Sequence, residues 1–405
     1  MSTYPLWRTL CCLAFVACGS VGAAPAAHQH GAKSAKAMDL GTSVAIDAQG
    51  TIWAIQKETN EGSQYLVLKK SSDTGRTWSA PKRILEQPEP IVAAGEGRPK
   101  LAFGNKGEVY ITYTKPYTKD YAGDVRFIRS LDGGQTFDPP RTVHVNRDII
   151  THRYDSLVVD PQGQIFIAWI DNRDAKAKRA RKQAYTGAAI YYTVSTDRGA
   201  SFAGDFKVAD HSCECCRIAL ALAPGGKVTA MWRHVFAPNV RDHAMTVLTP
   251  TGAVAAPERA TFDDWRIDAC PHHGPALAFG ANGTRHQAWF GVKGEEGGVY
   301  YASAAPGAPL GQPVKLGSDQ AAHPALAVAG ANIAVAWRQF DGKATAILAR
   351  TSRDGGANWE ERELARTAQA SDYPHLLSTA NGIVLAWRTQ DEGMRMLPLT
   401  AEKKP

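Results

Sequence analysis

Cysteine and histidine residues are concentrated in two short segments of the chain. Segment 213–216 holds three cysteines, and segment 270–273 reads Cys-Pro-His-His. Thiolates and imidazoles are soft to borderline ligands that suit copper or zinc. Paired disulfides, or a redox-active or nucleophilic thiol beside basic residues, are the alternative interpretations. The candidate metal ligands are Cys213, Cys215, Cys216, Cys270, His272 and His273.

The first residues of the chain read as an export signal. Residues 1–24 combine one early arginine, Arg8, with an apolar run from Leu10 to Ala17 and small residues after it. We therefore expect a periplasmic, outer-membrane-associated or extracellular protein. Once the signal is removed, four cysteines remain in an oxidising compartment, and an even number favours disulfides.

The same segment contains a second, competing signal. Phe15-Val-Ala-Cys18 is an imperfect lipoprotein-type cleavage box, so a lipid on Cys18 is the one membrane attachment that we expect. No other segment is apolar enough to span a bilayer. Residues 25–37 read as a flexible linker. The net charge of +7 fits an anionic partner without requiring one, export argues against nucleic acid, and we expect a monomer.

A strand–turn–strand unit recurs through the rest of the chain. In each copy a short apolar strand and a Gly or Asn turn precede a second strand that closes on an aromatic residue. The copies are 44–53, 101–113, 157–169, 218–232, 276–289, 325–337 and 376–387. Seven copies of one unit predict a repeat architecture made of β-strands.

Four of these units continue into a second motif, S-x-D-x-G-x-[TSN]-[WF]. The copies are Ser71 to Trp78, Ser130 to Phe137, Ser195 to Phe202 and Ser352 to Trp359. An Asp that accepts backbone N–H groups, a Gly with positive φ and a plugging aromatic are features of a turn, so the role is structural. The motif resembles the Asp box of bacterial sialidase-like β-propellers.

This resemblance covers residues 38–400 and implies an all-β fold, a single propeller. We expect seven four-stranded blades, with six as the alternative because sialidases usually have six, and we expect the chain termini to share the closing blade. The Asp boxes would lie on the face opposite the ligand site. The loops leading into the innermost strands would form a ring on the ligand face.

That ring is rich in arginine and histidine, whose side chains suit carboxylate or phosphate groups. The candidate ligand-binding residues are Arg98, Arg153, Arg233, Arg338, Arg388, His152, His323 and His375. A basic loop at 174–182 is expected to project from the same face, either to meet an acidic glycan or anionic headgroups or as a solvated loop. The expected partner is an anionic small molecule or an acidic glycan.

The resemblance also implies a set of catalytic roles. Sialidases hold the substrate carboxylate with three arginines and use a tyrosine–glutamate nucleophile with an aspartate acid. Here Tyr373 could be the nucleophile and Glu96 or Asp155 the acid. The first arginine of the family is missing, because Gly41-Thr-Ser-Val44 stands at its place.

Three functions are therefore predicted in competition. The first is an exported binding protein with a Cys/His/Arg site for a metal ion, an anionic ligand or both. The second is a sialidase or related glycoside hydrolase acting on acidic glycans. The third is a disulfide-stapled scaffold without catalytic activity.

Overall fold

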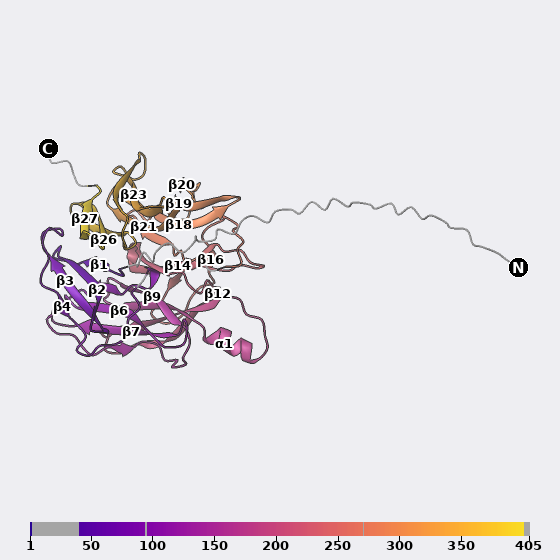
Figure 1. The fold of residues 1–405 in the computed structure, drawn as a ribbon, viewed down its shortest axis with the longest axis horizontal. Coiled ribbons are helices and arrows are strands. Elements are labelled where there is room, and N and C mark those ends of the chain that lie inside the picture. The colour runs from indigo at the N-terminus through magenta and orange to yellow at the C-terminus, as the bar shows by residue number, and fades with distance from the viewer. Residues whose placement is uncertain (2–39, 94, 270, 401–405) are drawn as a thin grey trace. The chain divides into compact units, whose positions relative to one another are not determined.

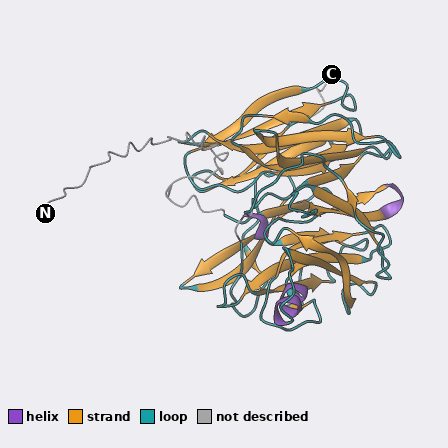
Figure 2. Ribbon diagram, turned by 90° about the vertical axis from the view of Figure 1, so that its right-hand side faces the viewer, coloured by secondary structure: helices purple, strands orange, loops and turns teal. Residues whose placement is uncertain are grey.

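The computed structural model describes residue 1 and residues 40–93, 95–269 and 271–400. The predicted signal at 1–24, the linker at 25–37 and Cys270 lie outside the described residues. Within residues 40–400 the chain forms seven antiparallel sheets, each built from strands that are consecutive in sequence (Figure 1). Strands make up nearly all of the regular structure (Figure 2).

Each sheet is one blade, and its innermost strand comes first in sequence. Blade 1 holds β1 (Ser43–Ile46), β2 (Ile52–Asn60), β3 (Ser63–Ser71) and β4 (Lys82–Arg83). Blade 2 holds β5 (Lys100–Phe103), β6 (Val109–Pro116), β7 (Gly123–Ser130) and β8 (Arg141–Thr142). Blade 3 holds β9 (His152–Val159), β10 (Ile165–Asp171), β11 (Ala188–Ser195) and β12 (Ala203–Ser212).

The remaining blades repeat this order. Blade 4 holds β13 (Ala219–Ala223), β14 (Lys227–Arg233), β15 (His243–Leu248) and β16 (Glu258–Arg259), and blade 5 holds β17 (Ala276–Phe279), β18 (Arg285–Lys293), β19 (Glu296–Ala304) and β20 (Val314–Leu316). Blade 6 holds β21 (Ala321–Ala329), β22 (Asn332–Phe340), β23 (Thr345–Ser352) and β24 (Glu360–Thr367), and blade 7 holds β25 (His375–Thr379), β26 (Gly382–Thr389) and β27 (Gly393–Pro398). Two short 3₁₀ turns, η1 (Gly95–Gly97) and η2 (Pro224–Gly226), interrupt the loops.

The seven-bladed propeller is confirmed, and the six-bladed alternative is excluded. Six blades have four strands, and blade 7 has three strands among the described residues. The prediction that the two termini share the closing blade concerns residues 2–39 and 401–405, which lie outside the described residues, and among the described residues β1 pairs only within blade 1. Instead, the Asp372 carboxylate accepts hydrogen bonds from Gly41 N at 2.5 Å and Thr42 N at 3.1 Å, which joins blade 7 to blade 1.

The packing between blades follows from the repeat. The second strand of each blade closes on an aromatic residue that points between neighbouring sheets. The fully buried ones are Tyr113, Trp169, Trp232, Trp289, Trp337 and Trp387. Apolar residues of adjacent blades surround these rings in a series of clusters around the propeller. Burial of large aromatic side chains is the main stabilising contribution to such an interface.

The Asp boxes have the structural role that their sequence predicts. Ser130 Oγ accepts a hydrogen bond from Gly134 N at 2.8 Å, and the Asp132 carboxylate accepts one from Thr136 N at 2.9 Å. Gly134 has φ of +81°, and a Cβ there would lie 2.7 Å from the Trp53 ring of the preceding blade. Only glycine meets both requirements, so each box fixes a turn against its neighbour.

One local prediction is wrong. Residues 174–182 were expected to form a loop, but Arg173–Ala180 form the α-helix α1, which lies beside blade 3 (Figure 1). Alanine and long basic side chains are good helix formers, and Asp174 stands in the first turn, where a negative charge is favourable. In the described part of the chain, no helix has the length and apolar character that a bilayer crossing requires.

Candidate functional site

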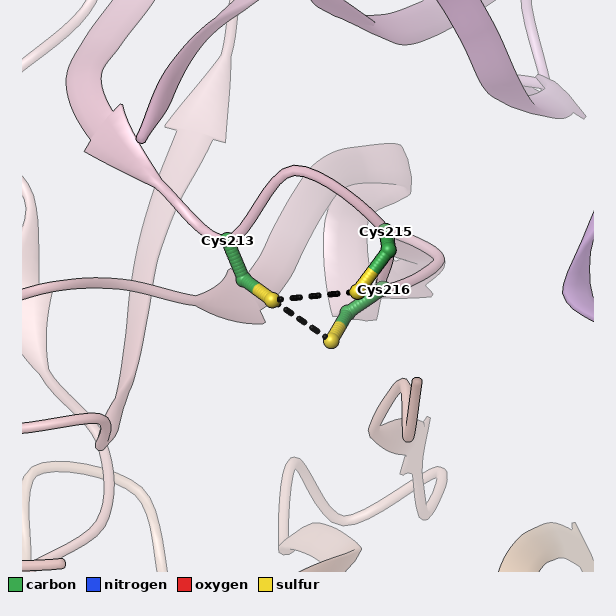
Figure 3. Close-up of side chains that lie close together, drawn as sticks. All are labelled: Cys213, Cys215 and Cys216. Carbon is green, nitrogen blue, oxygen red and sulfur yellow. Dashed lines mark hydrogen bonds between the residues drawn. The ribbon is translucent and has the colours of Figure 1, made fainter. Parts of the chain in front are cut away.

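The loop that leads into β13 brings three predicted metal ligands together. The Cys213 sulfur lies 3.7 Å from that of Cys215 and 2.9 Å from that of Cys216 (Figure 3). All three sulfurs lie within 4.8 Å of one another, and all three side chains are buried. No disulfide joins any of them to another described residue. The predicted Cys270 ligand falls outside the described residues.

The sulfur separations can be compared with what a metal ion or a disulfide requires. Sulfurs about 2.3 Å from one ion stand roughly 3.8 Å apart, whereas a disulfide joins them at about 2.05 Å. The distance between Cys213 and Cys215 matches chelation. The distance between Cys213 and Cys216 lies between the two values, so this pair is compatible with either interpretation after a small movement.

A buried arginine stands beside the thiols. Arg233 is the last residue of β14 and is 1% exposed. Its carbonyl accepts a hydrogen bond from Cys213 N at 2.9 Å. Its guanidinium donates to the carbonyls of Arg241 at 2.7 Å and Phe290 at 2.6 Å, and to that of His273 at 3.4 Å. Among the described residues no carboxylate lies within ion-pair distance of it. Arg233 is therefore a buried cation that lacks a direct acidic partner.

The charge of the thiols responds to this arginine. Burial and the hydrogen bond to Cys213 raise the pKa of Cys216 well above its usual value, and the positive charge of Arg233 acts in the opposite direction. His243 on β15 also interacts electrostatically with Cys213, and burial lowers its pKa well below the usual value. The His243 Nε2 atom is buried without a hydrogen-bond partner. Sequence reasoning missed His243, because it lies outside the ring of leading loops.

A second region occupies the propeller axis. All seven innermost strands line a cavity of about 390 Å³. Its wall is mostly apolar, but ionisable side chains gather where the leading loops meet the strands: Glu96, Arg98, Lys100, Arg217 and His375. The structure therefore places the predicted residues Glu96, Arg98 and His375 at the channel.

Glu96 is the centre of this channel cluster. Its carboxylate accepts a hydrogen bond from Arg217 Nη1 at 3.1 Å, and it meets His323 Nδ1 at 3.2 Å. Burial would raise the pKa of Glu96, but the charge of Arg217 and the hydrogen bond to His323 lower it to about 2. Because the carboxylate holds its charge, Glu96 fits a base or an ion-pair partner rather than the predicted acid.

Arg217 and Lys100 were not predicted as site residues, and both face the channel. Arg217 also donates to the carbonyls of Pro275 and Pro324, so it connects blade 4 with blades 2, 5 and 6. Burial lowers the pKa of Lys100 to about 8, against the opposing charge of Asp155. The signal for Lys100 was available, because it stands two residues after Arg98 and alternate residues of a strand share a face.

Aromatic rings continue from this cluster towards the thiol side. The Tyr373 ring stacks on His323 with centroids 3.7 Å apart, and His273 lies 4.5 Å from His323. His273 in turn stacks on Phe290 at 4.1 Å. Burial lowers the pKa of His323 to about 4, although Glu96 acts against this, so the ring is neutral at pH 7. His273 was predicted as a metal ligand and is here placed in this stack.

The other predicted arginines of the channel lie near Tyr373 and blade 1. The Arg338 guanidinium lies 5.2 Å from the Tyr373 ring centroid, and Arg388 Nη1 donates to Thr42 Oγ1 at 3.1 Å. Arg98 donates to the carbonyls of Thr42 and Tyr373 at 3.4 and 3.3 Å. These cations outnumber the nearby carboxylates of Glu96 and Asp372, so the channel mouth has an excess of positive charge.

Two predicted residues are buried away from the channel. Asp155 is fully buried, and its carboxylate accepts hydrogen bonds from Thr112 and Thr114 of β6 at 2.5 and 3.3 Å. His152 is also fully buried and stacks on His144, with centroids 3.8 Å apart. Both residues connect blades 2 and 3, which is a structural role.

The His144–His152 pair forms a cluster that sequence reasoning missed. Asp124, His144 and His152 are apart in sequence. In the structure, a carboxylate oxygen and one ring nitrogen from each histidine lie within 4.8 Å of one another. Burial lowers the pKa of His144 to about 4, and the neighbouring His152 acts in the same direction. The His144 Nε2 atom accepts a hydrogen bond from Val125 N at 3.3 Å, so its position is already explained by the backbone.

The predicted residues Arg153 and His272 line a third region, a cavity of about 580 Å³ beside α1. Cys215 also lines this side cavity, whereas Cys213 and Cys216 do not. The thiol cluster therefore borders the side cavity, and the channel cluster borders the axis. The sequence predicted one ring-shaped site, and the structure separates it into these regions.

Comparison with known proteins gives the fold. No protein-family model matches the chain, and no curated protein matches it. A solved ulvan lyase of a new polysaccharide lyase family, bound to -[GlcA(1-4)Rha3S]-, is 12% identical over 90% of this chain and 93% of that chain, with a TM-score of 0.55. The polysaccharide lyase Uly1 is 9% identical over 87% and 88%, with a TM-score of 0.51.

A sialidase is also similar. The Hadza microbial sialidase Hz136 is 11% identical over 80% of this chain and 65% of that chain, with a TM-score of 0.49. The architecture is established by the seven blades and by the four Asp boxes, each of which makes its turn hydrogen bonds. The chain folds as a seven-bladed β-propeller with Asp boxes. Such a fold hosts more than one chemistry, so function has to be argued from the side chains.

Proposed function

We propose that this protein is an exported propeller that binds copper or zinc through the three thiols of Cys213, Cys215 and Cys216, and an anionic ligand at the channel mouth. One observation carries the metal proposal: three buried sulfurs converge within 4.8 Å. Three thiols in one loop exceed what a single disulfide requires. Thiolates are the ligands that copper(I) and zinc favour most strongly.

Arg233 supports the proposal independently. A buried cation without an acidic partner is costly even when carbonyls accept its hydrogen bonds, and thiolates that hold a metal ion would supply the missing negative charge. Metal binding displaces the thiol protons, which overcomes the raised pKa of Cys216. Zinc usually takes four ligands. The predicted residues Cys270 and His272 remain proposed as additional ligands.

The test is the metal and thiol content of protein exported under its own signal and purified without chelators. We expect about one equivalent of copper or zinc, with its loss in the Cys213→Ser variant, because Cys213 contacts both other sulfurs. Thr136→Ser, in an Asp box, is the matched control and should keep the metal. Metal-free protein whose mass shows an intact disulfide would instead support the stapled scaffold.

A second candidate function follows from the channel mouth. We propose as the alternative a glycoside hydrolase, or a related enzyme, that acts on an acidic glycan. Tyr373, the neutral His323 and the charged Glu96 lie in one contact chain at the axis, beside Arg98 and Arg338. The solved ulvan lyase of similar fold is described as bound to a glycan that contains glucuronate.

Turnover assays decide between the two functions. A fluorogenic sialoside and a panel of uronate-containing glycans should be tested with the wild type and with Tyr373→Phe. Activity that Tyr373→Phe abolishes while metal content is unchanged would place the enzyme above the binding protein. Export, a lipid on Cys18 and a monomeric state remain part of the proposal, to be checked by fractionation, mass and sedimentation.

A further inference from the structure

The side cavity has a chemistry that neither the thiols nor the channel explains. Lys119, Arg153, Lys176 and Arg179 contribute four positive charges to its wall, and Asp120 and Glu214 contribute two negative ones. Lys176 pairs with Asp148, outside this wall, at 3.0 Å. The wall therefore carries more positive than negative charge, at a place where loops of four blades and α1 meet.

Arg153 is the least satisfied of these cations. No hydrogen bond or ion pair is found for it in the described part of the chain, and its Nε atom is buried without a partner. Its one recorded contact is with the Tyr154 ring, 5.5 Å from the guanidinium. A forked guanidinium in a concave, partly apolar site is the usual receptor for a carboxylate.

The backbone shows how Arg153 reaches the cavity. Pairing between β9 and β10 slips at Tyr154, which has a φ of +56°, so β9 contains a bulge. Tyr121 and His272, on other sides of the cavity, have φ of +58° and +56°. Non-glycine residues in this conformation are uncommon and gather at functional sites. The bulge separates Arg153 from Asp155, which is buried against blade 2.

A second unsatisfied atom lies in the same cavity. The Asn172 amide donates to Thr151 Oγ1 at 3.3 Å, but its Oδ1 atom is buried without a partner. Asn172 thus offers an acceptor for a hydroxyl, while Arg153 offers donors for a carboxylate. The Tyr121 ring, which is 70% exposed, adds an apolar face with a polar tip.

We propose that the side cavity binds a carboxylate-bearing sugar, with Arg153 holding the carboxylate and Asn172 Oδ1 accepting a hydroxyl proton. A cavity of about 580 Å³ has room for a short oligosaccharide rather than a single small anion. This site is separate from the anionic site proposed at the channel mouth, and it does not depend on metal at the thiols.

Calorimetry with the full-length protein tests the proposal, using trigalacturonate as the probe and the neutral maltotriose as its comparison. We expect trigalacturonate to bind and maltotriose to bind at least ten-fold more weakly. Arg153→Gln should weaken trigalacturonate binding at least ten-fold, and Arg153→Lys should weaken it less than Arg153→Gln does. Arg83→Gln, at a surface ion pair with Glu58, is the matched control and should leave the affinity unchanged. Arg388→Gln is measured beside it to detect binding at the channel mouth.

Three results would overturn the proposal. These are equal affinity for the two trisaccharides, no binding of trigalacturonate to a folded protein, and binding that survives Arg153→Gln. If Arg388→Gln weakens binding and Arg153→Gln does not, the sugar occupies the channel mouth, and the proposed function stands while this site falls. A circular dichroism spectrum of each variant confirms that the propeller is intact.

Discussion

The channel cluster and the thiol cluster each contain an arginine, partly buried in Arg217 and fully buried in Arg233, and the two charges are neutralised differently. Arg217 at the channel pairs with the Glu96 carboxylate at 3.1 Å. Arg233 at the thiols is held by three backbone carbonyls instead. The charge of Arg217 is thus balanced within the protein itself. The thiol cluster reaches electrostatic balance only when its sulfurs carry negative charge.

This difference separates what stabilises the propeller from what the propeller is prepared to bind. Glu96 and Arg217 come from loops of blades 2 and 4, so their contact connects blades that are not neighbours in the ring. The Arg233 guanidinium donates to the backbone carbonyl of Phe290 in blade 5, which leaves its positive charge unneutralised. That charge acts on the sulfurs. Substitutions at these two places should therefore change different measured quantities.

The largest effect is expected from Glu96→Gln. Removing the carboxylate leaves the largely buried charge of Arg217 without its acidic partner, and breaking a buried pair in this way costs about 3–5 kcal/mol. Urea unfolding at pH 7 should show that loss in the free energy of unfolding. Metal binding should be unchanged, because no thiol is involved.

Glu58→Gln is the matched control for this change. Glu58 pairs with Arg83 at 3.0 Å on the surface, where both side chains are more than a third exposed. Such exposed pairs contribute about 0–1 kcal/mol. Equal losses in the two variants would show that the channel cluster is no more important to the fold than a surface pair.

The next effect is expected from Arg233→Met, which keeps an unbranched apolar stem and removes the guanidinium with its charge. Loss of a group that supports the ligands of a metal usually lowers metal affinity about 10–100-fold. Competition with a chromogenic chelator measures this change. Arg388→Met, at the channel mouth, should leave the affinity for metal as it is. An unchanged affinity in Arg233→Met would remove the electrostatic argument for thiolates.

The fold could be predicted from the sequence because its signals repeat. Apolar strands that close on an aromatic, and Asp boxes such as Ser130 to Phe137, depend on neighbours within the same blade. The closure of the ring could not be predicted in this way. It depends on Asp372 meeting the amides of Gly41 and Thr42, a contact between residues more than 300 positions apart.

The candidate site was predicted only in part, for a related reason. The repeat located every leading loop, and Cys213, Cys215 and Cys216 do converge there. It could not show where each side chain turns. Arg153 leaves the axis because of the bulge at Tyr154, and Arg217 enters the axis because Glu96 lies opposite. Such choices depend on contacts between blades, which a pattern within one blade does not contain.

Lowering the pH should destabilise the channel cluster more than the thiol cluster. The loss in free energy of unfolding should be smaller than in the substitutions above, because the hydrogen bonds of Arg217 to the carbonyls of blades 5 and 6 remain. The folded pKa of Glu96 is about 2, against 4.5 for an ordinary glutamate. A depressed pKa means that the unfolded chain takes up the proton first. The stabilisation is therefore present above pH 4.5 and is lost as the pH falls towards 2.

Unfolding in urea at pH 7, 4.5 and 3 measures this dependence. The difference in free energy of unfolding between the wild type and Glu96→Gln should shrink as the pH falls. A difference that stays constant across these three values would mean that the charge of Glu96 contributes nothing to stability. The metal-free thiol cluster has no carboxylate in contact with Arg233 and should add little to the slope.

The smallest effect is expected at the face that carries the Asp boxes. Ser352 is 2% exposed and accepts a hydrogen bond from Gly356 N at 2.9 Å, so Ser352→Ala should cost about 1 kcal/mol, the contribution of an ordinary hydrogen bond. Thermal or urea unfolding checks the loss. Metal content and glycan binding should both equal those of the wild type, because the turn lies at the opposite end of blade 6 from His323. If Ser352→Ala altered either binding property, the two ends of a blade would be coupled, and the separation between scaffold and site would fail.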